Sequence, residues 1–339
     1  MSLHPNSAPV PAPIVVCVGI VTVDLVAVLD RELEPRLKQR ASRIVASPGG
    51  AAATAAAAAA KLGITARLVA RVGDDEREAT IRGWLGAAGV EDLLLLRAGS
   101  GSATSLVTID PGGERTIVNA TAAGLVGPLD ASDLEHLARA MEGAGAVCAD
   151  LRWPAGAQAA LEHAATAGVP GVLDLDRSLP DERERMLRLV RTATHVFASE
   201  PGLSDLIGTT DVDMALAELA ALMLDPADPA DPALPVTSFA GPRVVGVTLG
   251  ASGVRWRCVE PGPDATPRTS PAPVVETLET LGAGDVWHGV CAGELARGAT
   301  TERAIEVASA AAALRCTRRG GWDVLASAAQ VEALLERSA

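Results

Sequence analysis

The sequence predicts a doubly wound α/β fold built on a parallel sheet, and three observations support this. From residue 14 to residue 249, short apolar runs typical of buried strands alternate with helical stretches. A hydrophobic fraction of 48% over 339 residues is enough for the core of one large domain. A hairpin pattern near residue 110 stands apart from this alternation and indicates a second, smaller sheet.

The N-terminal half begins the alternation. Strands are expected at residues 14–19, 21–29, 66–72, 105–110 and 115–119, and a helix at residues 51–62. Gly49 and Gly50 precede this alanine-rich helix, and Gly63 ends it, as glycine commonly does at a helix C-terminus. The last two strands flank a Pro-Gly-Gly turn and therefore form the hairpin.

The C-terminal half continues the same alternation. Strands are expected at residues 146–149, 171–175, 195–198 and 244–249, and helices at residues 155–167, 180–192 and 212–224. Residues 225–235 and 261–273 are rich in proline and are predicted to be loops without a chemical motif.

Charge and composition exclude several classes of protein. A formal net charge of −13 disfavours nucleic acid as a partner, so an anionic substrate would need a local basic pocket. The longest apolar run, residues 51–60, is too short and too alanine-rich to span a membrane. Residues 1–13 lack the features of a signal peptide and are expected to form a flexible tail. Five isolated cysteines fit reduced thiols in a cytoplasmic protein without a zinc site.

The strongest candidate for chemistry is the segment from Leu281 to Asp285, which opens a helical pattern. The backbone N–H groups of Gly282, Ala283 and Gly284 can surround an anion at a helix N-terminus, where the helix dipole favours negative charge. Asp285 could then accept the proton of a substrate hydroxyl that attacks a phosphoryl group held there. The segment indicates phosphoryl transfer, and the alternative is an ordinary glycine-rich turn that starts a core helix.

Two further positions suit a sugar ligand. Asp24 lies in the strand that enters the smaller sheet, and its carboxylate can accept two hydrogen bonds from a vicinal diol. Gly49 and Gly50 allow the backbone to approach a ligand because no Cβ intervenes. The alternatives are a turn cap at Asp24 and a plain helix start at the glycine pair.

Four motifs resemble, in order and spacing, the ribokinase-like (PfkB) carbohydrate kinases: Gly49-Gly50 before the alanine-rich helix, residues 71–75, residues 248–253 and residues 282–285. The resemblance implies an ATP- and magnesium-dependent sugar kinase with a Rossmann-type doubly wound core. The kinase domain would span residues 14–325, with lid segments at about 21–48 and 103–121, and a C-terminal helix would follow at 326–339. Because so small a lid needs another surface to cover it, we expect a homodimer through the lid.

The resemblance also implies roles for the matching residues. Asp285 would be the catalytic base, and the backbone of Gly282, Ala283 and Gly284 would form the anion hole. The sugar would be held by Asp24, Gly49 and Gly50, and the nucleotide would lie against Thr248, Gly250 and Gly253. Glu200 would reach magnesium through a water.

A narrower resemblance, to sulfofructose kinases, appears in residues 147–153, 199–203 and 313–321. In those enzymes a sulfonate is bound by a Lys, an Asn and an Arg at positions that hold Lys38, Asn119 and Arg152 in this chain. An ammonium, an amide and a guanidinium suit the three acceptor oxygens and single charge of a sulfonate. This resemblance implies phosphorylation of the C1 hydroxyl of 6-deoxy-6-sulfofructose, a step of sulfoglycolysis.

The chain departs from the family pattern at four places, one of which is Glu78, where many members carry Gly. Glu279-Thr280-Leu281 stands where the family usually has Asp-Thr, which puts in doubt a monovalent-cation site that some members have in that region. Thr54 replaces a common Asn, and Ser199-Glu200 replaces Asn-x-x-Glu, so the route from Glu200 to magnesium is open.

The sequence disfavours one alternative function and leaves two open. A nicotinamide dehydrogenase is set aside because residues 18–23 carry one glycine where Gly-x-Gly-x-x-Gly is needed. A kinase of fructose 6-phosphate, tagatose 6-phosphate or fructose stays open, because a phosphate could use the same three anion-binding groups. A non-catalytic sugar sensor also stays open, since a fold does not fix a function. A sensor, however, has no need of Asp285 beside an anion hole.

Overall fold

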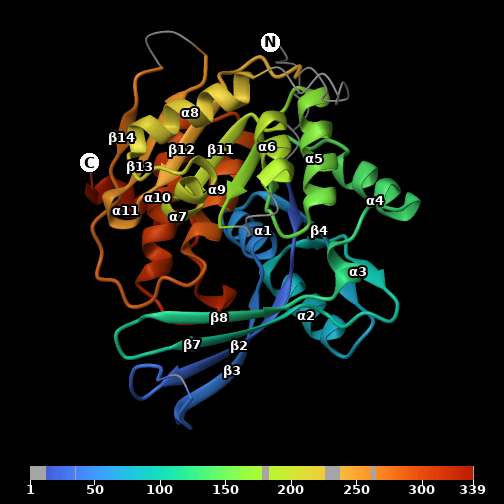
Figure 1. Ribbon diagram of the computed structural model, residues 1–339, viewed down its shortest axis with the longest axis vertical. Helices are drawn as coiled ribbons and strands as arrows, with labels where there is room; N and C mark the ends of the chain where they lie inside the picture. Colours follow the sequence, from blue (N-terminus) through green and yellow to red (C-terminus); the bar gives the residue numbers. More distant parts are fainter. Residues whose placement is uncertain (1–12, 35, 178–182, 226–236, 261–264, 339) are drawn as a thin grey trace, which may run out of the picture.

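The computed structural model describes residues 13–34, 36–177, 183–225, 237–260 and 265–338, and ten strands of this part form the central sheet (Figure 1). These strands are β1 (Ile14–Gly19), β4 (Thr65–Gly73), β5 (Glu91–Asp92), β6 (Leu95–Arg97), β9 (Ala146–Ala149), β10 (Gly171–Leu175), β11 (His195–Ser199), β12 (Val244–Thr248), β13 (Val254–Cys258) and β14 (Arg268–Ser270). Their order is β14-β13-β12-β11-β10-β9-β1-β4-β5, and β6 also pairs with β4. The pairing is parallel except at one edge, where β13 and β14 run antiparallel.

Helices cover both faces of this sheet, as a doubly wound fold requires. One face packs against α1 (Ala51–Lys61), α2 (Arg77–Ala88), α9 (Ala283–Ala296), α10 (Thr301–Cys316) and α11 (Ala328–Ser338). The other face packs against α4 (Ala131–Met141), α5 (Pro154–Ala167), α6 (Arg183–Thr192), α7 (Glu200–Ile207) and α8 (Val212–Leu224), while α3 (Ala123–Val126) is a short connection. Strand β1 serves both layers, because Val15 and Cys17 face the first core and Val16 and Val18 the second.

A separate four-stranded sheet, which we call the lid, projects from one end of the molecule (Figure 1). It consists of β3 (Ala41–Gly49), β2 (Thr22–Leu29), β7 (Thr104–Ile109) and β8 (Arg115–Ala120), in that order. Its inner face carries Asp24, Val26 and Val107, which are buried, whereas Leu25 and Leu106 are exposed on its outer face. The lid is therefore amphipathic, with an apolar outer surface.

The alanine-rich helix α1 packs against α9 as well as against the sheet. A Cβ on Gly289 would collide with the carbonyl oxygen of Ala55, and one on Gly293 would collide with the side chain of Ile64. Small residues on both helices are therefore required for this close approach. Both helices begin at the end of the core that faces the lid, so their packing brings the two N-termini together.

Most of the predicted elements are confirmed, including the strands at 14–19, 146–149 and 171–175. The prediction of a loop at 261–273 is wrong in part, because Arg268–Ser270 forms β14. Trp256 of β13 donates from Nε1 to Ser270 Oγ at 3.0 Å and fixes this pairing, which the local sequence does not reveal. The sheet is consequently mixed at its edge and not purely parallel. The predicted tail at 1–13 lies outside the described residues except for Pro13, as do most of the loop at 225–235 and the start of the predicted helix at 180–192.

Among the described residues, no helix combines the length and hydrophobicity that a membrane span requires.

Candidate active site

The site is centred on the first turn of α9. Gly282 precedes this helix with a φ of 74°, a left-handed conformation that glycine adopts without strain. No side chain caps α9 in the described structure, so the N–H groups of its first turn remain available to a ligand. Asp285 is the acidic residue of this turn.

Two glycine turns and two carboxylates line one small cavity of about 50 Å³. Asp24 of the lid, Gly49 and Gly50 before α1, and Gly282 and Asp285 at α9 all contribute to its wall. The sequence placed these five residues at a sugar and phosphoryl site, and the structure brings them together. Two positive helix ends converge on this cavity in a strongly acidic chain, which favours an anion there.

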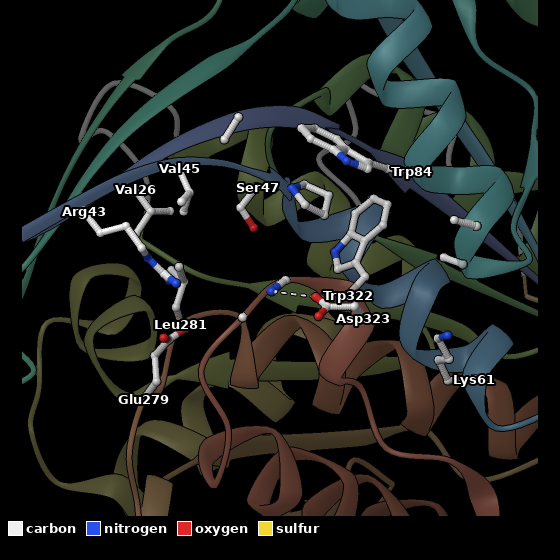
Figure 2. A pocket seen from close by; sticks show the side chains of 16 residues that line it. Val26, Arg43, Val45, Ser47, Lys61, Trp84, Glu279, Leu281, Trp322 and Asp323 are labelled. Carbon is white, nitrogen blue, oxygen red and sulfur yellow. Dashed lines mark hydrogen bonds between the residues drawn. The ribbon is translucent and has the colours of Figure 1, made fainter.

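A larger cleft of about 520 Å³ adjoins this cavity under the β3 edge of the lid. Ser47 and Trp322 line both spaces, and Figure 2 shows Leu281 and Glu279 below Arg43 of the lid. The cavity thus opens toward solvent through a space large enough for a sugar to enter.

Asp24 is held in place by its neighbours. Its carboxylate accepts a hydrogen bond from Thr22 Oγ1 at 2.6 Å, and a Cβ on Gly49 would collide with it. Burial raises the pKa of Asp24, and hydrogen bonds from the Thr22 and Ser105 hydroxyls oppose this shift. Asn119 lies opposite Ser105 in the lid register, so Asp24, Ser105 and Asn119 form a row on the inner face.

Asp150, which the sequence analysis did not single out, connects the parts of the site. Its carboxylate accepts hydrogen bonds from three backbone N–H groups: those of Ile20 at 3.0 Å, Ala52 at 3.0 Å and Arg152 at 2.7 Å. These belong to the β1–β2 junction, the first turn of α1 and the segment after β9. Burial raises the pKa of Asp150 to about 6 against the opposing effect of these hydrogen bonds. Its sequence signals were its position directly after a predicted buried strand and its place in the segment 147–153 that carries the narrower resemblance.

His288 is the second functional residue that sequence reasoning missed. Its Nδ1 lies 2.9 Å from the carbonyl oxygen of Gly284, and its Nε2 lies 3.1 Å from that of Phe197. Both partners are backbone carbonyl oxygens, which accept hydrogen bonds. Asp174 Oδ1 lies 3.5 Å from Nε2. His288 thus ties the first turn of α9 to the end of β11.

The environment of Asp285 makes its carboxyl group a weaker acid than usual. Burial raises its pKa to about 7, and the negative charges of Asp174, Asp150 and Asp176 add to this shift, while His288 opposes it. A carboxylate with a pKa near neutrality is suited to accept a proton from a hydroxyl.

The residues predicted to contact a nucleotide lie along the ends of β11 and β12. Thr248 ends β12, and Gly250 and Gly253 follow it with φ values of 56° and 85°. A Cβ on Gly253 would collide with the carbonyl oxygen of Ser270. Glu200 is exposed at the first position of α7. The cavity around Asp285 does not include these residues.

The predicted anion-binding residues are only partly brought together. Arg152 follows β9 and donates to Asp176 Oδ2 at 3.0 Å and to the carbonyl oxygen of Arg177 at 3.4 Å. Asn119 lies in the row with Asp24. Lys38 is exposed in the β2–β3 connection, beyond Leu29, which is about 17 Å along the strand from Asp24. Within one chain, Lys38 therefore lies apart from the other two.

A family model fits this combination of fold and site. The model of the pfkB family carbohydrate kinases matches residues 13–326. The chain belongs to the pfkB family. Within this PfkB kinase, Thr54, which replaces the common Asn, accepts a hydrogen bond from Trp322 Nε1 at 3.1 Å and so contributes to the wall of the cavity.

Solved structures agree with the family assignment. This PfkB kinase is similar to a "putative ribokinase" from Agrobacterium tumefaciens, with 29% identity, a TM-score of 0.82, and coverage of 96% of this chain and 98% of that one. It shares its fold with the ribokinase of Thermotoga maritima, at 22% identity, TM-score 0.74, and 96% and 99% coverage. It also shares the fold of an Arabidopsis thaliana ribokinase, at 22% identity, TM-score 0.73, and 96% and 99% coverage.

The raised pKa of Asp285 predicts how this residue affects stability. A carboxyl group with a pKa of about 7 in the folded state and about 3.8 in the unfolded state binds its proton more tightly when folded. It therefore costs stability as the pH rises from about 4 to 7. We expect the change in unfolding free energy caused by Asp285→Asn to be more stabilising at pH 8 than at pH 5, by roughly 2–4 kcal/mol. Urea unfolding of both proteins at the two pH values measures this difference.

Asp205 provides a control, because its replacement by asparagine should change the stability at pH 8 in the opposite direction. A hydrogen bond from Arg177 lowers the pKa of Asp205, so Asp205→Asn should destabilise the protein at pH 8. An Asp285→Asn variant whose stability changes equally at both pH values would contradict the pKa given for Asp285.

Proposed function

We propose that this PfkB kinase transfers the γ-phosphoryl group of ATP to the C1 hydroxyl of 6-deoxy-6-sulfofructose. The observation that carries the kinase chemistry is the cavity where Asp24 and Asp285 face two glycine turns at converging helix N-termini. The choice of ATP and Mg²⁺ is supported by proteins of the same fold: an Arabidopsis ribokinase solved with ribose and ATP, and a "putative Ribokinase II" of E. coli solved with ATP and Mg²⁺.

In the proposed reaction, Asp24 accepts hydrogen bonds from the sugar hydroxyls and orients the C1 hydroxyl toward Asp285. Asp285 accepts the proton of that hydroxyl as its oxygen attacks the γ-phosphorus. The N–H groups of Gly282, Ala283 and Gly284 stabilise the negative charge that develops on the transferred phosphoryl oxygens. The His288 ring, through Nδ1, contacts the carbonyl oxygen of Gly284 and so keeps these N–H groups in place.

The nucleotide side follows the family pattern. Thr248, Gly250 and Gly253 would lie along ATP. Gly250 is exposed and has open space where a Cβ would stand, whereas Gly253 is buried against Ser270 and would contribute by shaping the turn. Bound Mg²⁺ would neutralise charge on the phosphates. No group of three metal-ligating side chains occurs among the described residues, which suits an ion held mainly by phosphates and water, with Glu200 reaching it through a water.

The sulfonate is assigned to Asn119 and Arg152 of the same chain. Arg152 uses two of its five N–H donors on Asp176 and Arg177, so the remainder can serve an anion. Asn119 lies in the lid row that contains Asp24, and the backbone N–H of Arg152 donates to Asp150. Lys38, at the free end of the lid, would complete the set from a second protomer.

A homodimer through the lid would supply that second protomer. The outer lid face exposes Leu106 by 53%, Val118 by 58% and Ile44 by 68%, and Leu25, Leu106 and Val118 lie in register across three strands. An exposed apolar row of this kind favours burial against another copy. We also propose a cytoplasmic location, which is supported by the scattered, single placement of the five cysteines in the sequence.

The main alternative is a kinase of fructose 6-phosphate, tagatose 6-phosphate or fructose. A phosphate ester could use the same Asn and Arg, so substrate comparison must decide between the two anions. A catalytically inactive sugar sensor would have no use for a carboxylate whose pKa is raised toward 7 beside an anion hole.

Asp285→Asn tests the proposed base. The amide cannot accept the hydroxyl proton but keeps the shape of the side chain, so kcat should fall by about 10² to 10⁴ while the sugar KM changes little. A coupled assay of ADP release measures both constants. Turnover near that of the wild-type enzyme would remove Asp285 from the role of base.

Arg152→Ala tests the proposed substrate. A charge-assisted contact contributes about 1.5–3 kcal/mol, so kcat/KM for 6-deoxy-6-sulfofructose should fall roughly 10- to 150-fold and that for fructose should change far less. Arg177→Ala, which removes a neighbouring exposed guanidinium that pairs with Asp205, is the matched control and should leave both values unchanged. The sulfosugar assignment fails if fructose 6-phosphate or fructose has the highest kcat/KM with the wild-type enzyme.

Leu106→Asp tests the lid dimer. A buried aspartate without a partner is costly, so the variant should be monomeric by light scattering at micromolar concentration, whereas the wild-type protein should be dimeric. Leu134→Asp, at an equally exposed leucine of α4, is the control and should remain dimeric. A monomeric wild-type protein would contradict the proposal.

A further inference from the structure

Arg315 places a buried positive charge directly behind the anion hole. It lies in the last turn of α10 and is only 4% exposed. Its side chain lines the same cavity as Gly282 and Asp285. None of the roles proposed above uses this residue.

The guanidinium of Arg315 is surrounded by oxygen atoms. Nη2 donates to Glu279 Oε1 at 2.7 Å and to the carbonyl oxygen of Gly320 at 3.0 Å, and Nη1 donates to the carbonyl oxygen of Arg318 at 2.7 Å. The Glu279 side chain is itself buried, with 11% exposure. One carboxylate and two carbonyls are the kind of oxygen set that binds a hard metal cation in other proteins.

These oxygens join the two segments that frame the cavity. Glu279 belongs to the segment that leads into Gly282, and the N–H groups of Leu278 and Glu279 both donate to the carbonyl oxygen of Cys316 at the end of α10. Gly320 belongs to the turn that continues into Trp322, seen beside the cleft in Figure 2. Arg315 therefore links the segment that leads into Gly282 to the turn that contains Gly320.

The residues present do not fit a monovalent cation in this region. The carboxylate and carbonyl oxygens that would ligate the ion already accept hydrogen bonds from a fixed guanidinium. Leu281, in the segment that departs from the family pattern, adds no side-chain oxygen. A second positive charge at this place would also be repelled by Arg315.

We propose that Arg315 is a built-in cation that positions the anion-hole segment, so that this kinase works without bound potassium or sodium. Arg315 acts through Glu279 and Gly320 and is a positioning residue. The proposal rests on the kinase activity of the family and not on the identity of the sugar.

The first test compares the wild-type enzyme in potassium chloride and in choline chloride of equal ionic strength, with the sugar that gives the highest turnover. We expect kcat to differ by less than about twofold, because no alkali ion takes part. A wild-type enzyme that loses most of its turnover in choline chloride overturns the proposal.

The second test removes the guanidinium. Arg315→Ala leaves Glu279 buried without its partner, so kcat should fall about 10²-fold in choline chloride, with a smaller effect on the sugar KM. Guanidinium or potassium ions should restore part of this loss, and Arg315→Lys should retain more activity than Arg315→Ala. Arg318→Ala is the matched control, because Arg318 Nη1 donates to the carbonyl oxygen of Val324 and not to Glu279. Loss of turnover in Arg315→Ala that no cation restores would overturn the proposed role.

A third measurement needs no sugar and separates this proposal from the choice of substrate. Low concentrations of guanidinium should raise the Tm of Arg315→Ala but not that of the wild-type protein or Arg318→Ala. An equal effect on all three proteins would overturn the proposal. Suppose that 6-deoxy-6-sulfofructose does not have the highest kcat/KM of the sugars compared, while guanidinium still raises the Tm of Arg315→Ala alone. The substrate assignment is then wrong, and the proposed role of Arg315 is supported.

Discussion

The close packing of helix α1 against α9 is the constraint on which this site depends. Glycine at 289 and alanine at 55 allow the two backbones to meet, and the run of alanines along α1 lets the helix fit between α9 and the sheet. Larger side chains would separate the helices and with them the two N-termini. Because residues at both N-termini line one cavity, the alanine-rich segment shapes the proposed site through its packing.

Buried polar groups then fix what the helices position. Asp150 binds three backbone N–H groups from three segments, His288 binds two carbonyls, and Arg315 binds a carboxylate and two carbonyls. Burying each of these polar side chains costs free energy of desolvation, which its hydrogen bonds to partners in the site offset. The chain carries a net charge of −13, yet two helix N-termini, each of which favours an anion, meet at this one cavity.

The sequence was sufficient to predict the alternation of strands and helices, because buried parallel strands appear as local apolar runs. It also singled out Gly49, Gly50, Gly282 and Asp285, which the structure places around one cavity, since glycine turns at helix starts are local features. Asp150, His288 and β14 were not predicted, because their partners lie far away in the chain: Ala52, Phe197 and Trp256. Lys38 was grouped with Asn119 by resemblance alone, and only the lid topology revealed that it lies at the free end.

The central claim is that Asp24, the two glycine turns and Asp285 together form one site for phosphoryl transfer to a sugar. The most direct test is a crystal structure of the enzyme with 6-deoxy-6-sulfofructose, Mg²⁺ and a non-hydrolysable ATP analogue. The account predicts that the C1 hydroxyl lies within hydrogen-bond distance of Asp285, that the γ-phosphate lies at the N–H groups of residues 282–284, and that Asp24 contacts sugar hydroxyls. A γ-phosphate bound away from the N-terminus of α9, or a sugar whose hydroxyls do not approach Asp285, would contradict it.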